Sequence, residues 1–294
     1  MASSPYSISL NATVINQISN MTHKTNASVV AAFAGGNVKA SALFQGETPH
    51  SSNFSSTDLL TLLGLNTNTF ISAGLCVSGA VTSVPFRLRA DCAEFAAGST
   101  HSAIQCSNTL VTLDSISAKI NESAKADCTL RYKASDGFTS PVSFVSSIAL
   151  TDAAFIAEYM LHSVVVNDIV IPELQGIEIS TGLKVIDQKS PGPFTIAHFI
   201  QELMPTISIT TENLAYAGAV INAAPLGTGV LINFAKRKSG GIIEDLEDEV
   251  HLQIGGAVGI GHAESMGGDA RAVASNAVKL QTLTLTAVTG VALE

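Results

Sequence analysis

Alternation of apolar and polar residues is the dominant pattern along the chain, and it predicts β-strands. In Val84–Ala90, for example, Val84, Phe86 and Leu88 alternate with polar or small residues. Clusters of Gly, Asn, Ser and Pro separate the segments that have this pattern, as expected for turns. The other segments of this kind are Tyr6–Ile15, Leu110–Leu113, Cys128–Tyr132, Val142–Thr151, Val164–Val170, Gly229–Phe234, Val250–Ile254, Leu280–Ala287 and Thr282–Val291.

Helical periodicity is rare. Asp58–Leu63 is predicted to form a short helix, with the hydroxyl residues before it as the N-cap and Gly64 as its end. Ile196–Met204 is predicted to form a second helix, because its apolar residues fall on one face at a spacing of 3.6 and Pro205 stops it. The pattern therefore favours a mainly β fold in which short helices lie against the sheets.

The second half of the chain resembles a faint copy of the first half. The run Phe54–Leu65 has a counterpart in Phe194–Pro205, and each run leads into an Ala-Gly dipeptide, Ala73-Gly74 and Ala217-Gly218. The offset between these features is roughly 140 to 144 residues, about the length of one domain. This similarity indicates two related units rather than one irregular one.

The predicted fold class is mainly β, with two similar β-sandwich or barrel domains, each with one short flanking helix. The first domain would span residues 1–150 and the second residues 151–294, related by internal duplication. Asp152–Leu161 fits either a short helix that links the halves or the first strand of the second half.

Two long loops carry apolar residues. Gly35–Asn53 contains Leu43 and Phe44, and Gly176–Pro193 contains Val185 and Ile186 among its apolar residues. Exposed apolar residues on a long loop are unfavourable, so each loop needs a surface that covers it. Each loop therefore either folds back as a β-hairpin on its own domain or contacts another subunit.

Composition favours a protein that hides part of its surface in an assembly. Hydrophobic residues make up 46% of the chain and charged residues only 13%, about half the usual share. The absence of Trp and the aromatic content of 5% argue against a platform for stacking sugars or nucleobases. The net charge of −9 excludes counterion-driven binding to duplex DNA, although an acidic wall could surround DNA without binding it.

The sharpest charge feature is a basic triplet followed closely by an acidic run. Opposite charges joined by a flexible Gly-Gly could pair between identical subunits or within one hairpin, or the acids could line a pore. The candidate interface or lumen residues are Lys236, Arg237, Lys238, Glu244, Asp245, Glu247, Asp248 and Glu249.

No arrangement of residues predicts catalysis, a cofactor or a metal. Gly255–Gly261 lacks the context of a phosphate-binding loop, and a flexible hairpin or inter-subunit loop fits it better. His262 and Glu264, with His251 nearby, lack the spacing of a metal site. The expected protein is therefore not an enzyme and uses no cofactor.

The cysteines and the N-terminal residues bear on the redox state and the targeting of the protein. None of the four cysteine residues has a CxxC partner, so buried free thiols are expected, with two disulfides as the alternative. The first residues have neither a basic region nor an apolar region, so no signal peptide is predicted. No apolar run is long enough to predict a membrane helix.

Together, the strand-rich halves, the two predicted helices and the loops Gly35–Asn53 and Gly176–Pro193 resemble the major tail (tail tube) proteins of long-tailed phages. The resemblance implies units that form stacked rings, in which inner strands of neighbouring subunits join into one barrel with a negative lumen. Two units per chain are similar to the tandem variant, in which three subunits make a pseudo-sixfold ring. The loops, through Leu43, Phe44, Val185 and Ile186, would then bridge stacked rings.

The resemblance therefore implies a structural virion protein that assembles in the host cytoplasm into the phage tail. Its partners would be further copies of itself and other tail proteins, while DNA passes without specific binding and no membrane is involved. The composition also fits another virion part, such as a capsid, decoration or tail-terminator protein. A cell-surface β-sandwich adhesin and a β-rich hydrolase are further alternatives.

Overall fold

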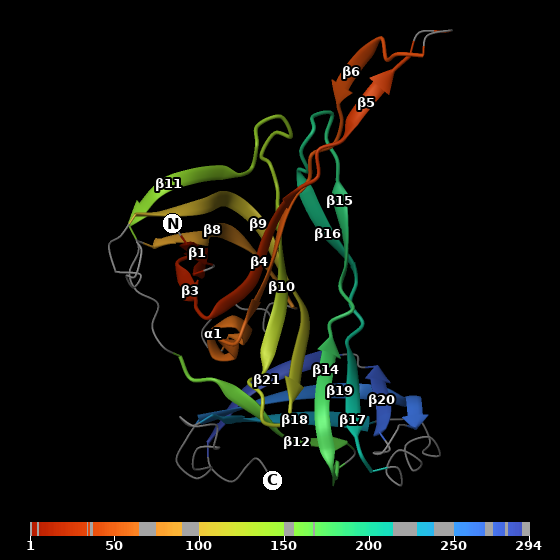
Figure 1. Cartoon of the computed structure of the whole chain (residues 1–294). Coiled ribbons are helices and arrows are strands. Elements are labelled where there is room, and N and C mark those ends of the chain that lie inside the picture. Colours follow the sequence, from red (N-terminus) through yellow and green to blue (C-terminus); the bar gives the residue numbers. More distant parts are fainter. Residues whose placement is uncertain are drawn as a thin grey trace.

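The computed structural model describes most of the chain as β-structure (Figure 1). The described residues are 2–4, 6–33, 35, 38–64, 75–89, 100–149, 156–166, 168–213, 228–237, 250–267, 273–279 and 282–289. Strands β1 to β7 span Ala2–Ser4, Ser7–Leu10, Thr13–Ile15, Ile18–Thr25, Val29–Ala32, Ala42–Gln45 and His50–Ser56. Helix α1 spans Leu59–Leu63, and β8 to β11 span Cys76–Arg89, Thr100–Lys119, Lys125–Tyr132 and Ser143–Ala149.

The remaining strands belong to the second half. Strands β12 to β16 span Tyr159–Val166, Ile169–Val170, Leu174–Ser180, Lys184–Gln188 and Ala197–Glu202. Strands β17 to β21 span Thr206–Thr211, Thr228–Lys236, Val250–Gly267, Val273–Lys279 and Thr282–Thr289. The protein is thus mainly β with almost no helix, as the alternation predicts, and its largest sheet is curled like half a barrel.

Strand pairing in the first half recurs in the second half. In the first half β2 pairs with β3 and β8, β4 with β7, β5 with β6, β7 with β10, and β9 with β8, β10 and β11. In the second half β12 pairs with β13 and β18, β14 with β17, β15 with β16, β17 with β20, and β19 with β18, β20 and β21. Each of these pairings is antiparallel, and each one in the first set has its counterpart in the second.

One antiparallel sheet of eight strands runs through both halves, in the order β4-β7-β10-β9-β14-β17-β20-β19. Its first four strands come from the first half and its last four from the second half. The pairing of β9 with β14 joins the two sets. The N-terminal part of β9 pairs instead with β8 and β11. The N-terminal part of β19 pairs in the same way with β18 and β21.

Most of the buried apolar residues in the described part of the two halves form one continuous cluster, and Tyr6, Val84 and Ala103 form a small separate one. The continuous cluster extends from Ile8 and Phe54 in the first half to Ile207 and Phe234 in the second. Side chains on strands alternate between faces, so the same strands present a polar face on the side away from this cluster. In β10, for example, buried Ala126, Cys128 and Leu130 alternate with the less buried Lys125 and Arg131.

Helix α1 forms where it is predicted. Asp58 is its N-cap, rather than the hydroxyl residues before it, and its carboxylate accepts a hydrogen bond from the Thr61 backbone N–H at 3.2 Å. Gly64 ends the helix in the left-handed conformation, at φ 84°. Leu59, Leu62 and Leu63 of the helix are buried in the core.

The second predicted helix is wrong. Ile196–Met204 contains strand β16, which pairs with β15 to form a long hairpin. A helix this short is marginal by itself, whereas each β16 residue in the ladder gains a backbone partner in β15. The apolar residues that suggested a helical face, such as Phe199 and Ile200, lie on an exposed strand instead.

The pairing order of the first half recurs in the second half, but in a different register from the sequence match. Ile18 begins β4 and Leu174 begins β14, 156 residues later. Phe54–Leu65 covers the end of β7 and α1, whereas Phe194–Pro205 covers a turn and β16, so these runs are not equivalent. A counterpart of α1 would lie between β17 and β18, where residues 214–227 are outside the described part.

The structure also bears on three further predictions. The glycine-rich Gly255–Gly261 is neither a hairpin turn nor a loop, because it lies inside strand β19. Asp152–Leu161 ends in strand β12, which begins at Tyr159, while residues 151–155 are not described. Cys106 and Cys128 are buried free thiols, as predicted, and Cys76 is a half-buried one, whereas Cys92 lies outside the described residues.

Candidate assembly surface

The eight-stranded sheet has two open edges. Among the described residues, β4 pairs only with β7, and no strand pairs with Ile260–Gly267 of β19 on the side opposite β20. Open strand edges carry unpaired backbone N–H and C=O groups and invite pairing with another chain. These two edges are the candidate assembly surface.

The β9–β14 junction shows how two such edges meet. Five residue pairs join the strands, from Ser115 opposite Ser180 to Lys119 opposite Gly176. Beside the central pair, Ile116 lies opposite Ile179, and both side chains are fully buried. The junction therefore combines backbone pairing with burial of apolar side chains, and each component is favourable.

The two open edges are the counterparts of the two strands at this junction. In the pairing pattern β19 corresponds to β9, and β4 corresponds to β14. A β-bulge occurs at the same place in β9 and β19, where the ladder skips Asp114 in one strand and Glu264 in the other. This shared irregularity fixes the alignment, so that Ile116 corresponds to Met266.

The pairing of β4 with β7 and of β14 with β17 identifies the β4 residue that corresponds to Ile179. Ile179 pairs with Ile207 in β17, and His23 pairs with Ser52 in β7. Ser52 and Ile207 are both fully buried and hold equivalent places in their strands. His23 therefore corresponds to Ile179, a correspondence that the sequence match did not reveal.

The apolar loop residues lie on two hairpins. Leu43 and Phe44 are in β6, and their exposed fractions are 69% and 56%. Val185 and Ile186 are in β15, opposite Ile200 and Phe199 of β16. In Figure 1 β5 and β6 project beyond the rest of the molecule, whereas β15 and β16 run alongside the first half. Leu43, Phe44 and Ile186 are exposed in the single chain and Val185 is half-buried, and their contact with another ring stays a prediction.

The turn of the β15–β16 hairpin docks on the first half of the same chain. The backbone N–H of Thr48 donates to the carbonyl oxygen of Pro193 at 2.7 Å, and that of Ala134 donates to Thr195 at 2.8 Å. The N–H of Phe194 donates to the carbonyl oxygen of Gly137 at 3.1 Å. Neither of the two loop alternatives describes this turn, because it docks on the first half of the same chain rather than on its own half or on another subunit.

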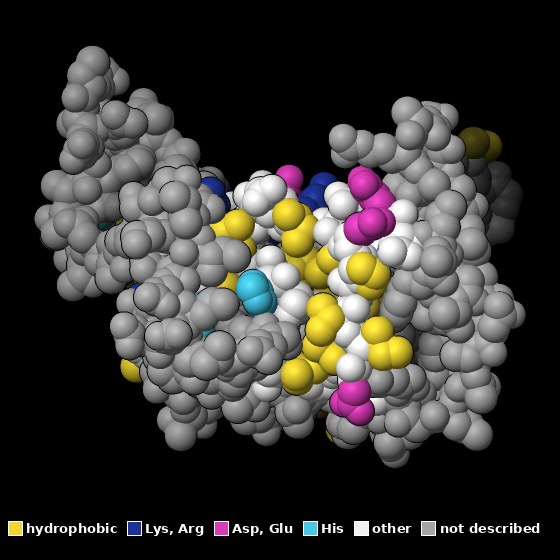
Figure 2. Space-filling view, turned by 90° about the horizontal axis from the view of Figure 1, so that it is seen from below, with side chains coloured by type: hydrophobic (Ala, Val, Ile, Leu, Met, Phe, Trp, Pro, Cys, Tyr) yellow, Lys and Arg dark blue, Asp and Glu magenta, His cyan; other side chains and the backbone are white. Residues whose placement is uncertain are grey.

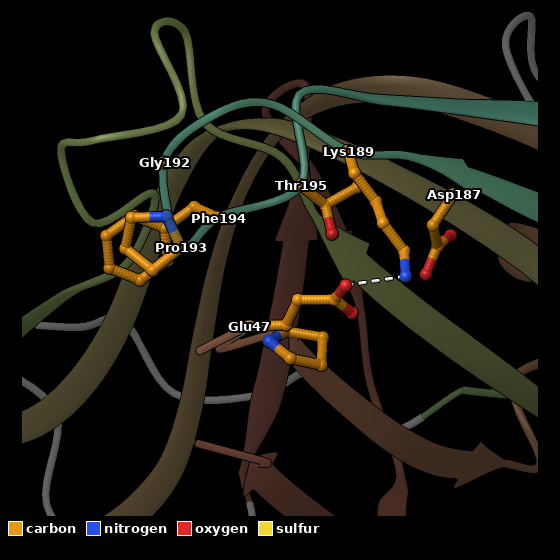
Figure 3. A pocket seen from close by; sticks show the side chains of 8 residues that line it. Glu47, Asp187, Lys189, Gly192, Pro193, Phe194 and Thr195 are labelled. Atoms are coloured by element: carbon orange, nitrogen blue, oxygen red, sulfur yellow. Dashed lines mark ion pairs between the residues drawn. The ribbon is translucent and has the colours of Figure 1, made fainter. Parts of the chain in front are cut away.

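Side chains reinforce the docked turn, as Figure 3 shows. Lys189 reaches toward Glu47 and forms an ion pair with an N–O distance of 2.5 Å. Phe194 stacks on His50 with ring centroids 5.6 Å apart. A Cβ on Gly192 would overlap the Gly137 carbonyl oxygen, so glycine is required for this close approach. The cavity beside them is about 60 Å³, which suits water rather than an organic ligand.

The polar face of the eight-stranded sheet is rich in Ser and Thr and has charges of both signs. Thr129 donates hydrogen bonds to Asn53 and Asp114, and Ser55 and Ser115 both donate to Asp127. Burial raises the pKa of the Asp114 carboxyl, and the hydrogen bonds from Thr129 and Thr112 oppose that shift. The charged residues described on this face are Lys24, Asp114, Lys119, Lys125, Asp127, Arg131 and Glu178.

This face is hollowed at the β9–β14 junction. An open depression of about 460 Å³ lies over β9, β14 and β17. Lys119 and Glu178 line it together with Ser117, Ser208 and Thr210. With few aromatic groups and opposing charges, such a surface offers neither a stacking platform nor a strong field for phosphates.

The basic triplet is only partly within the described residues. The Arg237 guanidinium forms an ion pair with Glu158 at 3.3 Å and donates to the Ser123 hydroxyl at 2.5 Å. The Lys236 backbone N–H donates to His251 Nδ1 at 3.0 Å. Arg237 is thus paired within its own chain. Outside the described residues lie the other members of the predicted charge cluster: Lys238, Glu244, Asp245, Glu247, Asp248 and Glu249.

The underside of the second half shows a further apolar surface. Figure 2 shows hydrophobic side chains gathered over the described middle of this face, with acidic side chains toward its margins. Ile169 and Val170 of β13 are exposed by 58% and 50%.

No group of three or more His, Cys, Asp or Glu residues in the described part is arranged to hold a metal ion.

Helix α1 has five residues, and no helix in the described ranges is long and apolar enough to cross a membrane. Comparison with known proteins gives no relative from which an activity could be inferred. No protein-family model matches this chain, and no curated protein matches it.

Proposed function

We propose that this chain is a structural, non-enzymatic subunit of a phage tail tube. Three copies close into a ring, and rings stack into a tube through which DNA passes without specific binding. The protein would be assembled in the host cytoplasm, with copies of itself and other tail proteins as partners. It needs no cofactor for this role.

The observation that supports the proposal best is the eight-stranded sheet, whose open edges correspond to the strands of its own internal junction. The β9–β14 pairing joins two equivalent units within the chain. Pairing of β19 with β4 of a second copy would repeat that contact between chains. Repetition through three chains would close a barrel of twenty-four strands, three times eight, and leave no open edge.

We infer that residues 1–150 and 151–294 arose by internal duplication. Support comes from the second-half counterparts of the first-half pairings, of which the pairing of β1 with β8 alone has none among the described residues. The shared core fits this inference, because the two units in one chain would be packed as neighbouring units in a ring are. A sandwich or barrel fold for each unit remains part of the proposal.

The polar face suits the wall of a passage. Its hydroxyl side chains are already hydrogen-bonded to carboxylates, as Ser55 and Ser115 are to Asp127. Basic and acidic groups are mixed on it, so a passing polyanion would be neither held nor strongly repelled by the described residues. The acidic run Glu244–Glu249 would add a repelling contribution if it also faces the lumen.

A crosslink tests the ring and its register together. The internal junction predicts that Met266 of one copy lies opposite His23 of the next, so cysteines at these two positions should form a disulfide between chains. The matched control pairs Met266→Cys with Ser51→Cys, because Ser51 lies in β7, one strand away from the edge. Covalent trimers only from the first pair, and rings in end-on electron micrographs, are the expected result. A strictly monomeric protein at high concentration would contradict the proposal.

A further inference from the structure

A histidine cluster lies on the open edge of the sheet. His23 in β4 stacks on His50 in β7, with ring centroids 6.0 Å apart, and its Nδ1 is 2.8 Å from the Ser52 hydroxyl. The Thr25 hydroxyl lies 3.0 Å from His50 Nδ1. The Tyr132 hydroxyl, 2.9 Å from Ser52, completes the chain of polar contacts. Two imidazoles therefore share one small site at the edge where another chain would add.

Closure of the ring would bury this site further. His23 is half-buried in the single chain, while its counterpart Ile179, covered by β9, is fully buried. The same cover from β19 of a second copy would remove His23 from water. The residue of β19 that would lie opposite His23 is the apolar Met266, while Glu264, the acidic residue of this stretch, is the bulge residue two positions away. Burial of a charged imidazole beside an apolar residue is unfavourable, so the covered site favours the neutral form.

We propose that His23 and His50 make closure of the ring depend on pH, with both imidazoles neutral in the closed state. This inference rests on the proposed ring. It adds a regulatory property to the β4 edge, namely that acid opens the contact between copies while each chain stays folded.

The groups around the two imidazoles support this direction. Burial lowers the pKa of His23, and burial together with the neighbouring His23 lowers the pKa of His50. The titratable group that faces them from β10 is Tyr132, whose pKa is raised by burial, with Cys106 beside it. From the β15–β16 turn the site meets Phe194, and the Glu47–Lys189 ion pair lies along the same turn. Lys24, the next residue in β4, is on the polar face.

The direction in which pH changes the closure of the ring follows from proton linkage. If closure lowers the pKa of an imidazole, the closed ring binds fewer protons than the free chains, and a rise in pH favours closure. Closure is then strongest above 6.5, the ordinary histidine pKa, and weakens as the pH falls below the pKa of the free chain. The association constant of one contact should fall by up to about tenfold per pH unit for each imidazole that must lose a proton.

The test measures assembly of the full chain by light scattering and electron microscopy at pH 8 and pH 5. The wild type should assemble at pH 8 and dissociate at pH 5. His23→Ile, which copies the residue found at the internal junction, should stay assembled at both. His50→Gln should retain part of the dependence, and a control, His162→Gln in β12, should behave like the wild type.

Each other outcome has a definite meaning. If the wild type assembles equally at both pH values, or if His23→Ile dissociates at the same pH as the wild type, the histidine proposal is overturned and the ring stands. If no variant assembles at pH 8 while denaturation shows folded chains, the ring itself is wrong. Chemical denaturation at both pH values separates dissociation from unfolding, which the proposal does not expect at pH 5.

Discussion

Proline substitutions at equivalent positions of β4 and β14 can separate strand pairing within the chain from strand pairing between chains. The two variants in β4 are Thr22→Pro and His23→Pro, and those in β14 are Glu178→Pro and Ile179→Pro. Neighbouring residues of a strand direct their N–H groups to opposite sides. One residue of each pair therefore donates toward β7 or β17, and the other donates toward the opposite side, which is the open edge in β4 and strand β9 in β14.

The loss of unfolding free energy in each variant depends on how many neighbouring strands pair with the substituted strand. Strand β14 is paired on both sides across Gly176–Ser180, so either proline there deletes a ladder hydrogen bond and leaves a carbonyl unpaired. That loss costs about 1–3 kcal/mol, and removal of the fully buried Ile179 side chain adds about 2–5 kcal/mol. In β4 the proline on the open side deletes no bond of the single chain, so its cost should stay within about 1 kcal/mol.

Two measurements complete the test. Urea denaturation gives the free energy of unfolding, and sedimentation velocity gives the assembled fraction at neutral pH. We expect one of the two β4 variants to unfold like the wild type and yet fail to assemble, while both β14 variants are destabilised. If the stable β4 variant assembles to the wild-type extent, the β4 edge is not a contact between copies, and the reasoning from the internal junction is refuted.

Three further predictions concern other parts of the structure. Phe44→Ser on the projecting hairpin should leave the unfolding free energy unchanged but reduce assembly in light scattering, whereas Phe54→Ala in the core should lose about 3–5 kcal/mol in urea denaturation; equal stabilities would contradict this. Burial raises the pKa of Asp58, so the folded chain binds its proton more tightly than the unfolded chain. The unfolding free energy of the wild type relative to Asp58→Asn should therefore rise as the pH falls from 7 toward 4; a pH-independent difference would show that burial does not matter. The half-exposed Arg237–Glu158 pair should show a coupling of at most about 1 kcal/mol in a double-mutant cycle, and a larger value would indicate a more buried pair.

Much of the strand content could be predicted from alternation, because one face of most strands is buried. Cys128–Tyr132 and Val250–Ile254 lie within β10 and β19, and their alternating apolar residues, Cys128, Leu130 and Tyr132 in the first and Leu252 and Ile254 in the second, are buried. The same reasoning missed β4, because as an edge strand it is exposed over most of Ile18–Thr25 and its polar residues show no clear alternation. The edge that matters most for assembly therefore has the weakest sequence pattern.

The predicted helix at Ile196–Met204 failed for a related reason. Apolar residues on an exposed hairpin need not alternate strictly, so Phe199, Ile200 and Leu203 imitated a helical face. Nor could the internal junction be read from sequence, because the partners Ser115–Lys119 and Gly176–Ser180 are distant in the chain and similar to other Ser-rich and Ile-rich strands. Only the pairing pattern identifies the equivalent strands.

The two hairpins show what the duplication would imply for the free chain. The β15–β16 hairpin extends from β14, the strand next to the first half, and its turn is held there by Thr48, Ala134 and Gly137. The β5–β6 hairpin extends from β4 in the same way, but the unit that should lie beside β4 belongs to another copy. If the units are equivalent, β5–β6 should dock on the second half of the neighbouring chain in the same ring. This contact would replace the contact between stacked rings that the resemblance implies for Phe44, and it would cover the side chain that is exposed in the single chain.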